Sequence, residues 1–210
     1  AIAGLRKVEK GNVILGGADI TNKSVKKIRE AGLTHIPEDR NTRGLNRAFT
    51  IADNLVEVEL DKTPIVKGGI VNKSAISKRA EEMIKKFDIR PADGSLPTSS
   101  LSGGNAQKVV VAREVNLGGK LLIASQPTRG VDIGAIESIR SILQDVKEQG
   151  LGVLLVSAEL EEVMSLSDRI IVMHEGKITG RMNADEADEE TLGLLMMGGH
   201  NAEEKGEQHE

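Results

Sequence analysis

From residue 101 onward, helix-like and strand-like segments alternate along the chain. Helices are predicted over residues 104–117 and 133–148, and each is followed by a short apolar strand, at 121–124 and 152–156. Apolar strands that alternate with helices are typical of a parallel sheet whose faces are covered by helices. This rhythm predicts an α/β fold with a mostly parallel sheet.

Shorter elements are predicted on both sides of this region. Helices are expected at 24–31, 51–60, from 72 or 74 to about 87, 160–164 and 189–197. Strands are expected on either side of Gly11-Asn12 within residues 5–20, followed by a turn at Gly16-Gly17, then at 33–36, and as a hairpin at 170–173 and 177–180. Loops are expected at 38–47 and around Gly68-Gly69. The helix that ends near residue 87 is amphipathic, because positions 76, 80, 83, 84 and 87 share one face.

Composition excludes several classes of function. The 210 residues carry a formal net charge of −4, which gives no basic surface for nucleic acid. The chain has no cysteine, and its four histidines do not fall at metal-ligand spacing, so no metal site is predicted. No run of about 18 apolar residues occurs, and any membrane association must therefore come through a partner.

The residues from Leu101 to Lys108, Leu-Ser-Gly-Gly-Asn-Ala-Gln-Lys, have the features of an anion site at a helix start. Two glycines let the backbone approach a phosphate, the first amides of the helix are free, and Ser102 adds a hydroxyl donor. A serine N-cap followed by loop glycines is the simpler interpretation of Ser-Gly-Gly alone. The anion site is favoured once the next motif along the chain is considered with it.

Seventeen residues after Gly104, the strand that begins at Leu121 runs into the polar turn from Ser125 to Asp132. The two motifs, in this order and spacing, closely resemble those of ABC ATPases. In this resemblance residues 101–107 are the signature motif, 121–126 the Walker B strand, 127–132 the D-loop, and 173–178 the hairpin that closes the fold. The resemblance covers nearly the whole chain, from about residue 5 to residue 197.

A narrower resemblance rests on Pro37-Glu38-Asp39-Arg40, on Asn105 and on residues 127–135. These segments resemble the second nucleotide-binding domain of bacterial importer ATPases for simple sugars and nucleosides, in which two such domains are fused. The resemblance implies a partial ABC ATPase domain over residues 1–197, which begins just after the Walker A strand and loop, with a helical subdomain at about 48–116. Residues 198–210 are expected to form a disordered acidic tail.

The chain departs from the family's working pattern at its catalytic positions. No G-x-x-x-x-G-K-[ST] loop occurs in the 210 residues, so no lysine of such a loop reaches the nucleotide phosphates. Ser125 and Gln126 stand where the Walker B strand should end in Asp-Glu, Glu38 stands at the Q-loop glutamine, and Ala158 at the switch histidine. This half is therefore expected to be inactive alone, and its sheet to expose the apolar faces of strands 121–124 and 152–156.

The signature residues Ser102, Gly103, Gly104 and Asn105 survive, as does the D-loop Asp132. ABC ATPases sandwich nucleotide between the Walker A loop of one domain and the signature of the other. The resemblance therefore implies that this half donates its signature to ATP and Mg²⁺ held mainly by the partner domain, and that Asp132 aligns the interface.

The resemblance also implies partners and a location. The partners are the other nucleotide-binding half, transmembrane permease subunits and, indirectly, a solute-binding protein. The location is the cytoplasmic face of the cell membrane, reached through the permease. Residues 125 and 126 are uncharged, and the second is a glutamine. By analogy with the family pattern, this pair favours nucleosides over simple sugars as the transported solute.

Three alternatives remain open at this point. A chromosome-maintenance or DNA-repair ABC head shares the signature and Walker B layout, but such heads carry long coiled coils, and this chain has no heptad run and a negative charge. Tandem ABC proteins of the translation machinery keep two complete ATP sites. A non-catalytic ABC-fold scaffold fragment would keep the fold and lose nucleotide binding. The arginines at 40, 43 and 47 form either an anion site or, more simply, a solvated charged loop.

Overall fold

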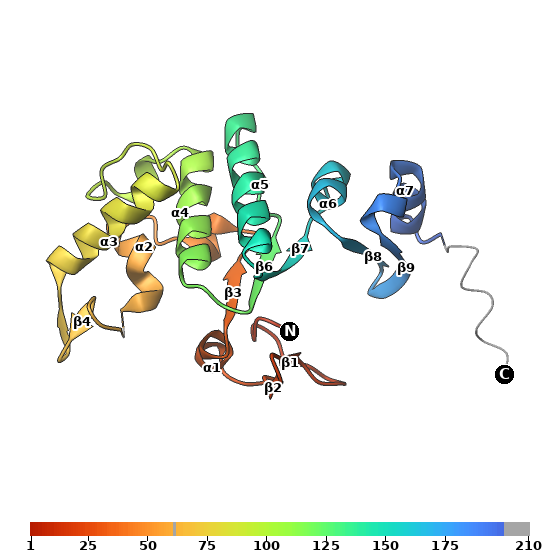
Figure 1. Ribbon diagram of the computed structural model, residues 1–210, viewed down its shortest axis with the longest axis horizontal. Coiled ribbons are helices and arrows are strands. Elements are labelled where there is room, and N and C mark those ends of the chain that lie inside the picture. Colours follow the sequence, from red (N-terminus) through yellow and green to blue (C-terminus); the bar gives the residue numbers. More distant parts are fainter. Residues whose placement is uncertain (61, 200–210) are drawn as a thin grey trace. The chain divides into compact units, whose positions relative to one another are not determined.

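Three parallel strands form the sheet on which the first part of the molecule is built (Figure 1). The strand β6 (Leu121–Ser125) lies between β3 (Leu33–Ile36) and β7 (Gly152–Val156). Leu121 pairs with Leu33 on one side and with Gly152 on the other. The predicted parallel sheet is confirmed.

The computed structural model describes residues 1–60 and 62–199. The chain divides into two units, Ala1–Val156 and the part that begins at Ser157. Within the described residues, no helix is both long enough and apolar enough to cross a membrane.

Two long helices of the first unit follow the boundaries that the sequence predicts. α4 (Gly103–Asn116) contacts β3 and α5, and α5 (Ile133–Glu148) also contacts β7. α5 buries a single stripe, with Ile139 and Leu143 at its centre, as expected for a helix that covers a sheet. α4 is buried on several sides: the side chains of residues 109–112 are all completely shielded from solvent.

A helical region lies on the far side of α4 from α5 (Figure 1). It consists of α2 (Ile51–Val56), a 3-10 turn (Glu57–Glu59), the small hairpin of β4 (Val66–Lys67) and β5 (Ile70–Val71), and α3 (Lys73–Lys86). The apolar face predicted for α3 is confirmed, because Ile76, Ala80, Met83, Ile84 and Phe87 are all buried.

In this region one predicted helix boundary is wrong, and a predicted loop is the turn of a hairpin whose strands were not predicted. The helix expected over 51–60 stops being α-helical at Val56, where Arg113 Nη1 reaches the Asn54 carbonyl oxygen at 3.4 Å and the 3-10 turn begins. The loop expected at Gly68-Gly69 is the turn of the β4–β5 hairpin. Both glycines have positive φ, +59° and +81°, which is the backbone that tight two-residue hairpins require.

The N-terminal segment contains the predicted helix α1 (Val25–Glu30), which is capped by Ser24, and a hairpin of β1 (Ile14–Leu15) and β2 (Ala18–Asp19). The two strands do not flank Gly11-Asn12, as the sequence suggested. They are joined by Gly16-Gly17. A tight two-residue hairpin turn requires positive φ at both residues, and Gly16 and Gly17 both have it, whereas in the Gly11-Asn12 pair only Gly11 has a positive φ.

The apolar faces of β6 and β7 differ in exposure. Leu122, Ile123 and Ala124 are buried, which contradicts the expectation that β6 would be exposed. Ile123 belongs to a core cluster with Leu15, Ile20, Ile28 and Leu33, because the N-terminal segment and α1 cover this face of the sheet. On β7, Leu154 and Val156 are 38% and 49% exposed, so the expectation holds for that strand.

A buried carboxylate joins α4 to other elements of the first unit. The Glu114 side chain is 1% exposed, and its Oε2 accepts hydrogen bonds from Arg29 Nη2 at 2.7 Å and from the His35 amide at 3.2 Å. Its Oε1 accepts from Arg113 Nε at 3.1 Å, and Arg113 Nη1 also pairs with Glu57 at 3.0 Å. This network connects α4 with α1, β3 and the helical region.

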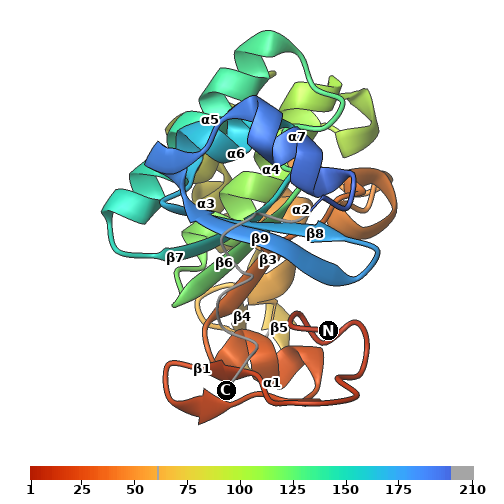
Figure 2. The same ribbon diagram turned by 90° about the vertical axis from the view of Figure 1, so that its right-hand side faces the viewer.

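The second unit consists of α6 (Leu160–Leu166), the hairpin β8 (Arg169–His174) and β9 (Lys177–Asn183), and α7 (Glu189–Met196). Figure 2 shows α7 lying along this hairpin, and its core contains Ile170, Val172, Leu192 and Leu195. The predicted hairpin and final helix are confirmed. The tail expected to be disordered at 198–210 falls, from residue 200 onward, outside the described residues.

Candidate functional site

The start of α4 is built around Ser102, which is exposed and caps the helix. Its Oγ accepts hydrogen bonds from the Asn105 amide at 3.3 Å and from Asn105 Nδ2 at 3.1 Å. In the part of the chain that the structure describes, the amides of Gly103 and Gly104 have no hydrogen-bond partner. A helix start with free amides and an exposed hydroxyl can bind an anion.

Asn105 is held on both sides by its own chain. Its Nδ2 donates to Ser102, and its Oδ1 accepts from the Arg90 amide at 2.7 Å. The side chain therefore joins the capping serine to the segment that follows α3. The resemblance to ABC ATPases assigns Asn105 only to the nucleotide-facing residues, and the structure adds this contact within the chain.

The two glycines pack against the loop at 126–132. A Cβ on Gly104 would lie 2.6 Å from both the Ala135 Cβ and Asp132 Oδ2, and a Cβ on Gly103 would lie 3.1 Å from the Gly130 carbonyl oxygen. The sequence suggested that these glycines leave room for a phosphate. In the structure their absent side chains also leave room for the neighbouring loop.

The loop at 126–132 is fixed at several points. Gln107, which is 3% exposed, donates from Nε2 to the Pro127 carbonyl oxygen at 2.8 Å. Asp132 caps α5, where its Oδ1 accepts from the Ala135 amide at 3.0 Å. Gln126 has a φ of +48°, so the chain turns sharply as it leaves β6.

The charged segment at 38–47, predicted to be a loop, contains the π-helical turn Arg40–Gly44. Asp39 begins the turn by accepting from the amides of Asn41 and Thr42 at 2.9 and 3.2 Å. Hydrogen bonds from the Thr42 side chain and from these two amides lower the pKa of the exposed Asp39 carboxyl group. Sequence patterns could not predict this turn, because its geometry depends on packing against α4.

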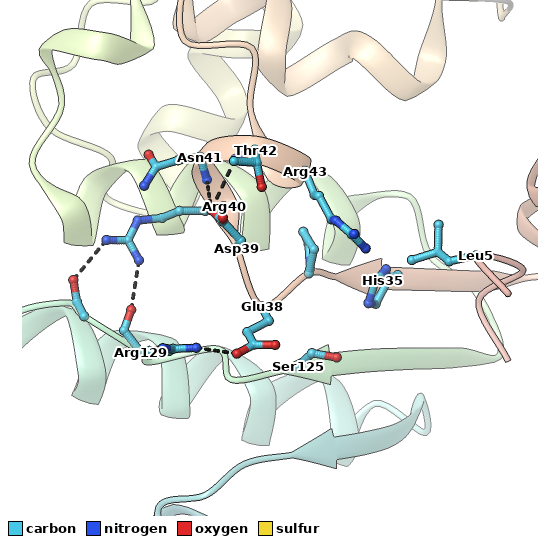
Figure 3. Close-up of a pocket in the computed structure, with 12 residues that line it drawn as sticks. Leu5, His35, Glu38, Asp39, Arg40, Asn41, Thr42, Arg43, Ser125 and Arg129 are labelled. Carbon is cyan, nitrogen blue, oxygen red and sulfur yellow. Dashed lines mark hydrogen bonds and ion pairs between the residues drawn. The ribbon is translucent and has the colours of Figure 1, made fainter. Parts of the chain in front are cut away.

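A cavity of about 770 Å³ opens between this turn and the end of β6. Figure 3 shows Glu38, Ser125 and Arg129 together at its wall, with the Glu38 carboxylate paired to the Arg129 guanidinium. The structure thus brings together two predicted positions, Glu38 and Ser125. Gln126 comes directly after Ser125, and its amide donates to the Val156 carbonyl oxygen at 2.7 Å. Ala158 lies just after β7, at the start of the second unit.

The cavity also contains residues that the motif analysis missed, notably Leu5, His35 and Arg43. Burial lowers the pKa of His35 and the Glu114 carboxylate opposes this, but the positive charges of Arg29 and Arg43 also lower it. The pKa therefore lies below its usual value, which favours the neutral imidazole near pH 7. Among residues 1–60 and 62–199, no group of three His, Asp or Glu side chains could hold a metal ion.

Comparison with known proteins gives this arrangement a family. The sequence profile described as ABC transporter matches residues 1–129. The nucleoside import ATP-binding protein NupA of Lactococcus lactis subsp. cremoris (strain MG1363) is 43% identical over 200 residues, which cover 95% of this chain and 40% of that protein. The chain belongs to the ABC transporter family.

Two further relatives have similar coverage. The guanosine import ATP-binding protein NupO of Bacillus subtilis (strain 168) is 43% identical over 198 residues, 94% of this chain and 39% of that protein. The ribose import ATP-binding protein RbsA of Caldanaerobacter subterraneus subsp. tengcongensis is 40% identical over 198 residues, which cover 94% of this chain and 40% of that protein. The chain spans about two fifths of the length of these curated relatives.

Solved structures agree on the ABC fold. The dimeric ATP-binding cassette MJ0796, in a post-hydrolysis state bound to ADP and Pi, matches with a TM-score of 0.72 at 23% identity, covering 87% of this chain and 77% of that one. At this identity the likeness establishes the fold alone. The fold is that of an ABC ATPase of the P-loop type, with a parallel sheet and a helical subdomain, as predicted.

The packing of the start of α4 against the 126–132 loop can be tested with alanine. Gly104→Ala should lower the free energy of unfolding by about 1–3 kcal/mol, because its Cβ would overlap Asp132 and Ala135. Gly134→Ala, in the first turn of α5, is the control, since its Cβ would come no closer than 3.7 Å to Asp132 and alanine is the better helix former. Urea unfolding measures both, and equal stabilities for the two variants would contradict the packing argument.

Proposed function

We propose that this chain is the C-terminal, catalytically degenerate half of a fused two-domain ABC importer ATPase. In this proposal its signature motif, residues 102–105, completes an ATP site whose Walker A loop belongs to the other half. The start of α4 carries the argument. Ser102 is exposed, Gly103 is partly buried and Gly104 is buried, and the amides of both glycines are unpaired in the described part of the chain. The start of the helix can therefore offer the Ser102 hydroxyl and the Gly103 amide to a phosphate from outside.

The chain's own catalytic positions support the degenerate role. Ser125 brings no carboxylate to the cavity at the end of β6, and the Glu38 carboxylate there is neutralised by Arg129. Gln126 can orient a water molecule but cannot take its proton, and a general base typically contributes 10²–10⁴-fold. ATP and Mg²⁺ would therefore be bound mainly by the partner domain, while this half contributes donors.

The remaining parts of the proposal come from the family. The partial ABC domain covers residues 1–197, with the helical subdomain at about 48–116. The partners are the other nucleotide-binding half, the transmembrane permease subunits and, through these, a solute-binding protein. The protein would then lie at the cytoplasmic face of the membrane.

Nucleosides are the proposed cargo. Two relatives at 43% identity are named for nucleoside and guanosine import, and the Ser125-Gln126 pair agrees with the nucleoside pattern. The solute contacts the permease and the binding protein, so the argument rests on likeness and not on a pocket in this chain.

The cargo can be tested on the assembled transporter. With the ATPase, its permease and its solute-binding protein reconstituted together, nucleoside-loaded binding protein should raise ATP turnover and ribose should not. A complex that responds to ribose and ignores nucleosides would reverse this assignment. The same complex without binding protein gives the basal rate.

The degenerate site predicts weak nucleotide binding by the 210-residue chain itself. Because the sequence contains no Walker A loop, MgATP should bind no tighter than about 1 mM, or roughly −4 kcal/mol. Isothermal titration calorimetry measures this affinity, with circular dichroism as the control for folding. A micromolar site in the folded chain would contradict the proposal.

The signature role predicts loss of activity at the partner's site. In the two-domain protein, Ser102→Arg should lower turnover by at least about 10²-fold, because it removes a donor and places a bulky side chain at the phosphate position. Ser141→Arg, at an exposed position in the middle of α5, is the matched control and should keep wild-type turnover. Normal turnover of the Ser102 variant would leave the scaffold alternative as the better account.

A further inference from the structure

Arg40 binds two consecutive carbonyl groups of the loop at 126–132. Its Nη1 donates to the Arg129 carbonyl oxygen at 2.8 Å, and its Nη2 donates to that of Gly130 at 3.0 Å (Figure 3). A planar guanidinium can hold two acceptors at once, which a lysine ammonium cannot do in the same geometry. The sequence interpretation of Arg40 as part of a solvated loop or an anion site is therefore replaced by a contact within the chain.

The backbone that carries Arg40 is itself held in place. Arg40 is the first residue of the π-helical turn, whose start is capped by Asp39. The turn rests on α4 through Gly44, where an added Cβ would meet Val110 at 3.1 Å and the Arg40 Cβ at 3.3 Å. The guanidinium therefore projects from a fixed support.

The same guanidinium lies against the signature motif. A Cβ on Gly103 would be 2.9 Å from Arg40 Nη2, so this part of the α4 start, the Arg40 head and the Gly130 carbonyl are packed together. Close by, the Arg129 side chain leaves the loop to pair with Glu38, the residue just before the turn's capping aspartate. The π-helical turn, the start of α4 and the loop at 126–132 are distant in sequence, and they thus meet at the Arg40 side chain.

We propose that Arg40 is a positioning residue that fixes the D-loop turn against the start of the signature helix, so that the surface offered to the partner's nucleotide is formed before the two domains meet. This inference rests on the proposed function, which supplies the partner's site. Arg40 acts through Gly103 and Gly130, and it does not itself touch ATP. Small misplacements of donors at such a site have large effects, since about 1 Å can cost 10²-fold in rate.

The test uses the two-domain protein with three variants. Arg40→Met keeps the apolar stem and removes both donors, Arg40→Lys keeps the charge, and Arg47→Met is the control at an exposed arginine of the same segment. Arg40→Met should lower kcat for ATP about tenfold or more with KM for ATP nearly unchanged, and Arg40→Lys should recover part of the loss. Arg47→Met should match wild type.

A second readout separates positioning from general destabilisation. Amide hydrogen exchange, followed by mass spectrometry, should become faster at residues 129–132 in Arg40→Met, with the melting temperature and the exchange of α5 unchanged. Unchanged exchange at this loop would overturn the inference. If Arg40→Met fails to fold, Arg40→Lys carries the test, and a wild-type kcat with wild-type exchange in that variant also overturns it.

Ser102→Arg, measured in parallel, distinguishes the two proposals. Loss of turnover in Ser102→Arg together with normal kcat in Arg40→Met overturns the role of Arg40 and leaves the proposed function standing. Normal turnover in Ser102→Arg overturns the proposed function, and the functional part of the Arg40 inference with it. Loss of kcat in both, with faster exchange only in Arg40→Met, supports both.

Discussion

The contact between the start of α4 and the loop at 126–132 holds the whole site together. At Gly104 the two segments approach so closely that a Cβ would lie 2.6 Å from Asp132 and Ala135. Gln107 fixes the loop from the helix side through the Pro127 carbonyl group, and Arg40 fixes it from the π-helical turn. Because these contacts reach the loop from two elements, α4 and the π-helical turn, the relative placement of α4, β6 and α5 cannot change without breaking one of them.

In the proposed function, this junction separates two chemical roles within one ABC domain. On its outer side, Ser102 is exposed, and the amide of the partly buried Gly103 has no hydrogen-bond partner in the described part of the chain. On its inner side, the cavity at the end of β6 contains Ser125, which has no carboxylate, and Glu38, which is paired with Arg129. A domain of this kind can contribute phosphate donors to a shared site while it lacks the groups to activate water at its own, because donors depend on backbone geometry and catalysis depends on particular side chains.

Buried polar groups extend the same constraint beyond the junction. Glu114 lies on α4 two turns beyond Gln107 and binds Arg29, Arg113 and the His35 amide, so α4 is tied to the sheet and to the helical region as well as to the loop. Removing one partner of such a buried cluster leaves a buried charge without a counter-charge, and this destabilises the fold. α4 is therefore the element through which a displacement of the helical region would reach the signature residues.

Sequence patterns alone predict the parallel sheet, the boundaries of α4, α5 and β7, and the serine at the start of α4, and residue identity alone shows that Ser125 and Gln126 carry no carboxylate. These features are local: they depend on apolar periodicity, capping chemistry and residue identity. Three-dimensional packing was needed to establish that Gly103 and Gly104 accommodate the neighbouring loop, that Asn105 binds the Arg90 amide, that β6 is buried, and that Arg40 holds the carbonyl groups of Arg129 and Gly130. Those contacts join residues up to 90 positions apart. No periodic pattern records such a pairing, because it depends on where the sheet brings the ends of its strands and helices together.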